Sequence, residues 1–328
     1  MQNDDRMSKD LKKDSRKVRI ASPGAADPLD SFRAYCQLIR LPNLFTSAAD
    51  ALAGFFVTHP RIAETDLSSL WVIVFSSVAF YAGGVVLNDW VDREVDRQER
   101  PHRPIPSGAV SARAAWKLGV GFLLLGLILA ALVAWQRQNP WPVIVAALLT
   151  TTITFYNFWA KRFFVGPIVM GLCRAENLLL GASLGIGKIA AFWPVTLALG
   201  VYVVGISVFA RRETERSPRR NLAAGLCLMF AGLGILGVFP LTAQRVVVGQ
   251  ERLWLLLAVL ALWMLLRGVW TLADPIPRRV QITVTQAVMG IIVLDAAAVF
   301  VTHGPLGALP VLALVLPTTW AARWIAAT

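Results

Sequence analysis

The sequence predicts an all-α, polytopic membrane protein, and three observations lead to this fold class. Of the 328 residues, 56% are hydrophobic and only 16% are charged, whereas charged residues make up about a quarter of an ordinary soluble domain. The mean hydropathy is +0.59. Apolar runs of about 20 residues, long enough to cross a bilayer as a helix, recur after residue 33. Such continuous runs differ from the alternating strands of a membrane barrel and therefore indicate helices.

Two regions follow from the distribution of polar residues along the chain. Residues 1–33 are charged and have no apolar core, so we expect a disordered, basic cytoplasmic tail and no signal peptide. A transmembrane domain takes the remainder, 34–328. We expect nine spans, at 34–58, 68–89, 114–135, 141–159, 166–186, 192–210, 221–240, 253–272 and 281–302. The segment 309–328 is apolar but interrupted by Pro317, and we expect it to be an interfacial or partly inserted helix.

The basic residues predict the orientation of these spans. Five segments that would lie on one side, starting with the tail, hold eight, five, two, five and two Lys or Arg residues, whereas the opposite loops hold five altogether. By the positive-inside rule, we expect the N-terminus and the loops on its side to face the cytoplasm, in a bacterial-type cytoplasmic membrane. The net charge of +12 then reflects topology and contact with the lipid bilayer, and we expect no nucleic-acid partner.

The segment LNDWVDREVDRQERPHRPIPSG, residues 87–108, follows an apolar run and holds Asp89, Asp92 and Asp96. If the preceding helix continues for two turns, steps of three and four residues put these aspartates on one face. Three carboxylates would then crowd one patch at a membrane surface. Like charges so close do not all stay ionised without a cation among them, and Mg²⁺ prefers carboxylate oxygens together with substrate phosphates.

A solvated helix end is the alternative, because Asp89 with Arg93 and Asp96 with Arg100 are spaced at i,i+4 for ion pairs. The following residues, RPHRPIPSG, favour a ligand site. Arg100 and Arg103 bracket prolines in a rigid basic turn suited to diphosphate oxygens. Carboxylates that hold a metal beside fixed guanidinium groups, at the entrance of an apolar cavity, suit a molecule with a diphosphate head and a hydrocarbon tail.

The pattern NDxxDxxxD followed by RPxPSG closely resembles the first aspartate-rich motif of the UbiA superfamily of intramembrane prenyltransferases. The segment FYNFWAKRFFVGPIVMGLCRAENLLLGAS, residues 155–183, resembles the next shared block and is most similar to the EboC-like branch. The resemblance implies helices around a central, lipid-open cavity and Mg²⁺ as cofactor. It also implies transfer of a prenyl group from a prenyl diphosphate to an acceptor.

The resemblance assigns the metal motif and a basic residue that contacts diphosphate to matching positions, which are Asn88, Asp89, Asp92, Asp96 and Lys161. Arg103 aligns with the arginine of the RPxPSG turn. The spacer before that turn is shorter than in the quinone-pathway members, which leaves the role of Arg100 open. Tyr156 in the second block either stabilises a developing cation through its π face or serves packing.

The second metal motif of the superfamily, DxxxD after the sixth helix, is replaced here by FARRETERSPRR at 209–220. Glu213 and Glu215 are two residues apart and would point to different sides of a helix, so we expect only Glu213 to face the cavity and bind metal. Arg211 and Arg212 either take over part of the charge neutralisation or belong to a basic loop that only sets the topology.

Asp50, Arg174, Glu176 and Asp295 lie well inside predicted spans, where an unpartnered charge costs about 2.5–3.5 kcal/mol on insertion scales. Arg174 belongs to the family block together with Asn177, and we expect both to line the cavity, with Arg174 near the diphosphate and Glu176 as its charge partner. Asp50 and Asp295 either bind the acceptor, act as its general base, or form structural pairs between helices.

The leading hypothesis is a Mg²⁺-dependent prenyltransferase that uses a prenyl diphosphate and an unidentified small-molecule acceptor. The alternative is a non-enzymatic membrane transporter or lipid-binding protein on the same scaffold. An enzyme needs the loop aspartates and Mg²⁺, whereas a transporter tolerates their loss better than the loss of Asp50 and Asp295.

Overall fold

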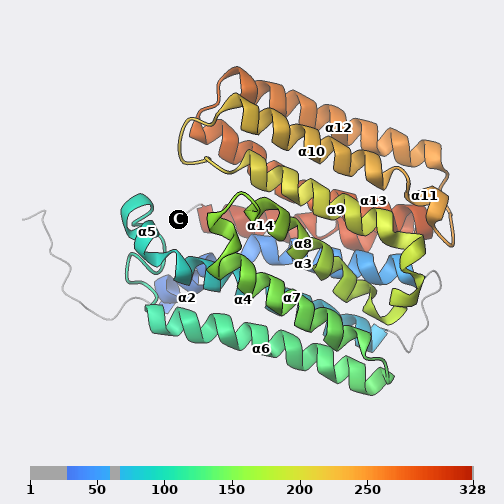
Figure 1. Cartoon of the computed structure of the whole chain (residues 1–328), viewed down its shortest axis with the longest axis horizontal. Coiled ribbons are helices and arrows are strands. Elements are labelled where there is room, and N and C mark those ends of the chain that lie inside the picture. Colours follow the sequence, from blue (N-terminus) through green and yellow to red (C-terminus); the bar gives the residue numbers. More distant parts are fainter. Residues whose placement is uncertain (1–27, 60–66, 327–328) are drawn as a thin grey trace, which may run out of the picture.

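The computed structural model describes residues 28–59 and 67–326. All regular elements in these two ranges are helices, and the long ones lie side by side along one direction (Figure 1). In chain order the helices are α2 (Pro28–Leu38), α3 (Leu41–Thr58), α4 (Leu67–Val91), α5 (Arg93–Glu99), α6 (Ala112–Arg137), α7 (Trp141–Phe158), η2 (Ala160–Arg162), α8 (Gly166–Ala182), η3 (Ser183–Lys188), α9 (Ile189–Phe209), α10 (Arg219–Leu236), α11 (Phe239–Thr242), α12 (Gln250–Ala273), α13 (Pro277–Leu312) and α14 (Val315–Ala326).

The bundle is built for a bilayer. Seven stretches of the described chain are long and apolar enough to cross a membrane. One of them, 166–209, contains both α8 and α9, and another, 277–325, contains α13 and α14, while α3 is not among the seven. The chain is therefore an integral, multi-pass membrane protein, but the predicted number of nine spans is not confirmed.

Three layers are visible in the bundle (Figure 1). Helices α4, α6 and α7 lie on one side, α10 and α12 lie on the other, and α3, α8, α9, α13 and α14 lie between them. We name the end that carries the aspartate loop, residues 89–110, the motif end, and the opposite end the far end. The start of α3 and the ends of α7 and α9 meet at the motif end, because residues next to each contact the loop.

Both ends of the predicted domain differ from expectation. Residues 1–27 of the predicted tail lie outside the described residues, and the helical part already begins at Pro28. Near the C-terminus, Gly304 adopts φ +72° and the chain turns back, so that α14 packs on α3. Arg33 of α2 donates to the Trp324 carbonyl oxygen at 3.4 Å. The segment predicted to be interfacial therefore runs back along the bundle toward the motif end.

Helices α3 and α8 touch at backbone level. A Cβ atom added to Gly54 would lie 2.1 Å from the Leu178 carbonyl oxygen, and one added to Gly181 would lie 2.1 Å from that of Ala51. Small residues allow such contacts where lipid gives helices no hydrophobic reason to associate. Asp50 on α3 and Asn177 on α8 stand one turn before the two glycines, so this crossing brings them together.

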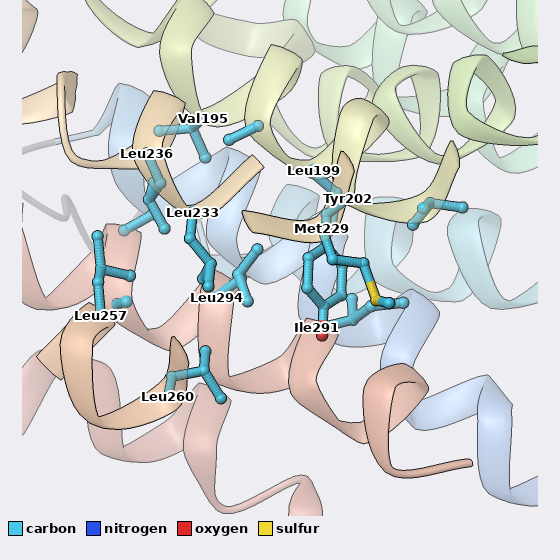
Figure 2. Packing of buried hydrophobic residues seen from close by; sticks show 14 of the residues in the cluster. Val195, Leu199, Tyr202, Met229, Leu233, Leu236, Leu257, Leu260, Ile291 and Leu294 are labelled. Carbon is cyan, nitrogen blue, oxygen red and sulfur yellow. The ribbon is translucent and has the colours of Figure 1, made fainter. Parts of the chain in front are cut away.

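The second half of the chain supplies the largest apolar cluster, from α9, α10, α12 and α13 (Figure 2). Tyr202 lies at its centre, fully buried, and donates to the Ala287 carbonyl oxygen at 3.0 Å. Leu233 of α10 and Leu257 of α12 belong to the same cluster. This tightly packed half supports the α3–α8 side of the bundle, where the polar groups gather.

Candidate active site

The aspartate loop begins as a continuation of α4. The Asp92 amide donates to the Asn88 carbonyl at 3.0 Å and the Asp96 amide donates to that of Asp92 at 2.8 Å. Helical hydrogen bonding therefore passes through the junction between α4 and α5, as the sequence predicts. Asp89 and Asp96 are both buried, at 6% and 4% exposure.

Two arginines hold Asp89 and Asp96. Asp89 Oδ1 lies 3.1 Å from Arg40 Nη2 and 3.3 Å from Arg103 Nη1. The same Arg103 nitrogen lies 2.7 Å from Asp96 Oδ2. The arginine of the RPxPSG turn thus bridges the first and third aspartates, and the basic turn folds back on the carboxylates.

Lys161, in the short helix η2 after α7, holds the middle aspartate. Its Nζ lies 2.6 Å from Asp92 Oδ1 and donates to Asn88 Oδ1 at 3.3 Å. Burial lowers the pKa of the Lys161 ammonium below its ordinary value, and the contact with Asp92 only partly opposes this effect. Lys161, which the resemblance implies to be a diphosphate contact, thus lies beside the aspartate motif.

The three carboxylates do not form one crowded patch. Among the described residues, no group of three or more His, Cys, Asp or Glu side chains is close enough to hold a metal ion. The predicted three-carboxylate cluster is not assembled in this arrangement, because Lys161 holds Asp92 while Arg103 holds Asp89 and Asp96. Asp89 and Asp96 contact Arg40 and Arg103, so the alternative i,i+4 ion pairs with Arg93 and Arg100 are not formed among the described residues.

The chemistry of Asp89 and Asp96 nevertheless fits Mg²⁺. Their oxygens already converge on one cationic nitrogen, Arg103 Nη1, at 3.3 and 2.7 Å. A cation held by two carboxylates matches the way Mg²⁺ binds in proteins, with one or two carboxylates and the remaining positions taken by water and phosphate oxygens. Arg103 therefore stands where a metal would sit or beside it.

Glu213 reaches the loop from the end of α9. The segment after Phe209 forms turns, and Glu213 Oε1 lies 3.5 Å from Arg100 Nη2. Both residues line a cleft that opens at the motif end. Glu213 is half-buried and Glu215 is exposed. Glu213 is joined to the loop through arginine and is not among the aspartates.

A cavity of about 160 Å³ extends into the bundle beside the loop. Arg40 and Asn88 lie at its motif end, and its walls are mostly apolar. The full lining consists of Arg40, Phe80, Tyr81, Gly84, Val85, Asn88, Leu149, Ile153, Tyr156, Asn157, Met170, Cys173, Arg174 and Asn177. The predicted residues Asn88, Tyr156, Arg174 and Asn177 are thus brought to one space.

Arg174 and Asn177 belong to a buried polar network. Arg174 Nε lies 3.1 Å from Asp50 Oδ2, and Asn177 Nδ2 donates to the same oxygen at 2.8 Å. Arg174 Nη2 also donates to Thr46 Oγ1 at 2.5 Å, and its guanidinium lies over the Tyr81 ring. Arg174 is therefore fixed at the cavity wall by α3, away from the aspartate loop, and its expected place near the diphosphate is not supported.

The remaining intramembrane acids lie behind this wall. Asp50 and Asp295 are 0% and 1% exposed, and within the described residues Asp50 Oδ1 and Asp295 Oδ2 accept no hydrogen bond. For Asp50, the ion pair with Arg174 fits the alternative of a structural pair between helices. Glu176 accepts a hydrogen bond from Thr152 at 3.0 Å, so its expected pairing with Arg174 is wrong.

Arg40 is the functional residue that sequence reasoning missed. The predicted span 34–58 treats it as part of one helix, but Arg40 adopts φ +50° and separates α2 from α3. The signal was the following Leu-Pro, since proline favours the first turn of a helix. Tyr81 was missed as well, because an aromatic residue within an apolar run carries no distinguishing pattern.

Known relatives agree with this fold. The model of the UbiA prenyltransferase family matches residues 48–278. The structure of a UbiA homologue from Archaeoglobus fulgidus bound to GPP and Mg²⁺ is 17% identical, with a TM-score of 0.62 over 85% of this chain and 99% of that one. The apo structure of a UbiA homologue from Aeropyrum pernix is 18% identical, with a TM-score of 0.60 over 77% of this chain and 96% of that one.

Curated relatives include the digeranylgeranylglyceryl phosphate synthase of Saccharolobus solfataricus, which is 30% identical over 46% of this chain. The chain spans about half of that relative's length, 51%. The enzyme of the same name from Sulfolobus acidocaldarius is 24% identical over 83% of this chain and 87% of its own length. Because the family model covers most of the transmembrane domain, including the aspartate loop and the Arg174 helix, the chain belongs to the UbiA prenyltransferase family.

Proposed function

We propose that this protein transfers a prenyl group from a prenyl diphosphate to a small-molecule acceptor, with Mg²⁺ as cofactor. The observation that carries the proposal is the arrangement at the motif end, where Asp89 and Asp96 converge on one cationic nitrogen beside Arg40 and Lys161, at the mouth of an apolar cavity. A diphosphate head would lie among these charges, and its hydrocarbon tail would contact apolar walls.

The carboxylates would hold the metal. Asp89 and Asp96 would form the first pair of ligands, Asp92 would add a third carboxylate if Lys161 paired with the diphosphate, and Glu213 would serve a second metal. When bound, Mg²⁺ neutralises the negative charge of the departing diphosphate. The open cleft that contains Glu213 and Arg100 supports a role for the altered second motif.

The residues of the chain would supply binding, orientation and exclusion of water. Arg103, Arg40 and Lys161 donate hydrogen bonds to diphosphate oxygens, and Asn88 and Arg100 complete the polar rim. The bond between the allylic carbon and the diphosphate oxygen breaks, and its electron pair leaves with the diphosphate. The acceptor's nucleophilic atom then forms a bond to that carbon and gives up its proton.

The cavity would protect the cationic carbon. Apolar walls limit attack by water, and the ring faces of Tyr81 and Tyr156 stabilise positive charge. Arg174 and Asn177 at the inner wall orient the acceptor, while Asp50 and Asp295 hold them in position. The names of the relatives and the GPP and Mg²⁺ bound to the Archaeoglobus homologue support this class of substrate and cofactor.

We also place the motif end in the cytoplasm, on the basis of its basic loops, and keep the EboC-like branch as the predicted subgroup. Both assignments rest on the sequence patterns alone.

Binding of a non-hydrolysable farnesyl or geranylgeranyl diphosphate analogue to the purified protein tests the proposal without knowledge of the acceptor. We expect binding with Mg²⁺, its loss in EDTA, and its loss in Asp92→Asn. Asp274→Asn is the matched control, because Asp274 is also an ion-paired aspartate, contacting Arg216 at 3.0 Å, but belongs to another loop.

A well-folded wild type that binds no analogue would refute the prenyl-donor assignment. Attention would then pass to transport, with Asp50 and Asp295 as the residues to change.

A further inference from the structure

A second charged surface lies at the motif end, outside the candidate active site. The end of α4 and the start of α6 form a groove of about 470 Å³. We name it the α4–α6 groove, and its lining residues are Trp90, Arg93, Ala112, Arg113, Trp116 and Lys117. Every charged residue in this lining is a cation, and the two large apolar ones are tryptophans.

Arg93 is fixed at one wall of the groove. Its Nη1 donates to the Trp90 carbonyl oxygen at 2.8 Å, and its guanidinium lies 4.7 Å from the centroid of the Trp90 ring. Its Nε lies 3.5 Å from Glu94, which also pairs with Arg97. The Nη2 group takes part in none of these contacts and provides donors for a ligand.

The opposite wall comes from the first turns of α6. Arg113 and Lys117 stand four residues apart, on the same face of the helix, and both are exposed. Trp116 lies between them in the sequence, and 45% of its surface is exposed. Neither cation forms an ion pair within the described part of the chain, so their charge is not neutralised by the protein.

Close packing of α4 and α6 holds the two walls at a fixed separation. A Cβ atom at Gly119 would lie 2.7 Å from Leu87 Cγ, and one at Gly83 would lie 2.9 Å from the Gly119 carbonyl oxygen. Ala115, on α6 between Arg113 and Lys117, is fully buried in a cluster with residues of α2 and α4. The groove is therefore present before any ligand binds.

We propose that the α4–α6 groove binds the head group of an anionic phospholipid, with Arg93, Arg113 and Lys117 around the phosphate and the two tryptophans beside the upper acyl chains. Charge complementarity favours this occupant, since three cations line the groove and Glu94, the acid that contacts Arg93, also pairs with Arg97. The position favours it as well, because tryptophans mark the level of lipid head groups and basic pockets between membrane helices recognise anionic lipids. This site does not depend on the proposed prenyl transfer.

The test uses dioctanoyl phosphatidylglycerol as probe and dioctanoyl phosphatidylcholine as the zwitterionic reference, with binding to the full chain in detergent followed by native mass spectrometry. Wild type should prefer the anionic lipid. The double substitution Arg113→Gln with Lys117→Gln should weaken phosphatidylglycerol binding by about 30-fold, the effect of removing two basic charges near an anionic surface. Phosphatidylcholine binding should change little.

Two controls separate the charge of this groove from general effects. Arg252→Gln removes an exposed arginine beside the apolar α12–α13 groove and should leave phosphatidylglycerol binding unchanged. Arg113→Lys with Lys117→Arg keeps the charges and should retain binding. Equal binding of the two lipids by wild type, or full phosphatidylglycerol binding by the double glutamine variant, would overturn the proposal.

Discussion

The protein contains two charged networks, and they differ in how far water reaches them. At the motif end, Asp89 and Asp96 are buried, but the side chains of Arg40 and Asp92 are 38% and 32% exposed, and each aspartate contacts a basic side chain at the mouth of the cavity. In the middle of the bundle, Asp50 is 0% exposed and shares one oxygen between Arg174 and Asn177.

This difference separates ligand binding from folding. Partly exposed ion pairs contribute little to stability, so the basic groups at the motif end are free to exchange a carboxylate for a diphosphate or a metal. Removal of one partner from a buried ion pair strongly destabilises the fold, because the remaining charge is neither paired nor solvated. We therefore expect substitutions in the first network to affect ligand binding, and those in the second to affect the fold.

The largest expected effect is on stability, from Asp50→Ala. This change leaves Arg174 buried without its carboxylate and removes an acceptor from Asn177, so the protein should lose about 3–5 kcal/mol. Thermal unfolding in detergent measures the loss. Asp274→Ala removes an exposed ion pair and should cost less than about 1 kcal/mol. Equal unfolding midpoints for the two variants would contradict the structural role of Asp50.

The next effect concerns the metal site and Asp96→Ala. Loss of one of two convergent carboxylates should weaken Mg²⁺-dependent binding of a prenyl diphosphate analogue about 100-fold, equivalent to about 2.7 kcal/mol. Asp96 is buried and paired with Arg103, so the unfolding midpoint without ligand should fall as well, and the affinity is compared on the folded variant. Titration of the analogue at fixed Mg²⁺ gives the affinity, and unchanged affinity would remove Asp96 from the site.

A smaller effect is expected from Gly181→Ala at the crossing of α3 and α8. The new methyl group would lie 2.1 Å from the Ala51 carbonyl oxygen, so the helices must separate, at a cost of about 1–3 kcal/mol. Gly187→Ala, where an added Cβ meets no atom within 4 Å, is the control. If Gly181→Ala unfolds at a midpoint as high as that of Gly187→Ala, the helix crossing accommodates the methyl group without strain.

The smallest effect should come from Glu213→Gln. Its contact with Arg100 is long, 3.5 Å, and partly exposed, so analogue binding should fall by about fivefold, or 1 kcal/mol. A loss of analogue affinity as large as that expected for Asp96→Ala would mean that Glu213 is a principal metal ligand.

Much of the site could be predicted because its residues follow local patterns. The spacing of Asp89, Asp92 and Asp96 and the following arginine turn are readable within 22 residues. In the structure Asp89 and Asp96 share Arg103, whereas Asp92 pairs with Lys161, which comes from the second block of the family resemblance.

Other features depend on contacts between distant helices. Arg40 reaches Asp89 because the helix is interrupted before α3. Arg174 pairs with Asp50, which is distant in sequence, and not with its sequence neighbour Glu176, because the α3–α8 crossing brings Asp50 next to it. The number of spans is not confirmed for a related reason. Apolar runs locate helices, but they do not show that the chain turns back at Gly304.

The most direct test of the division between the two networks is thermal unfolding of wild type, Asp92→Asn and Asp50→Asn, each with and without Mg²⁺ plus the diphosphate analogue. A ligand that binds the folded state raises the unfolding midpoint. We expect Asp92→Asn to keep the wild-type unfolding midpoint without ligand and to lose the ligand-induced rise. Asp50→Asn should have a lower unfolding midpoint than wild type without ligand, and the ligand should still raise it. A lowered ligand-free midpoint in Asp92→Asn together with an intact ligand-induced rise would contradict this division.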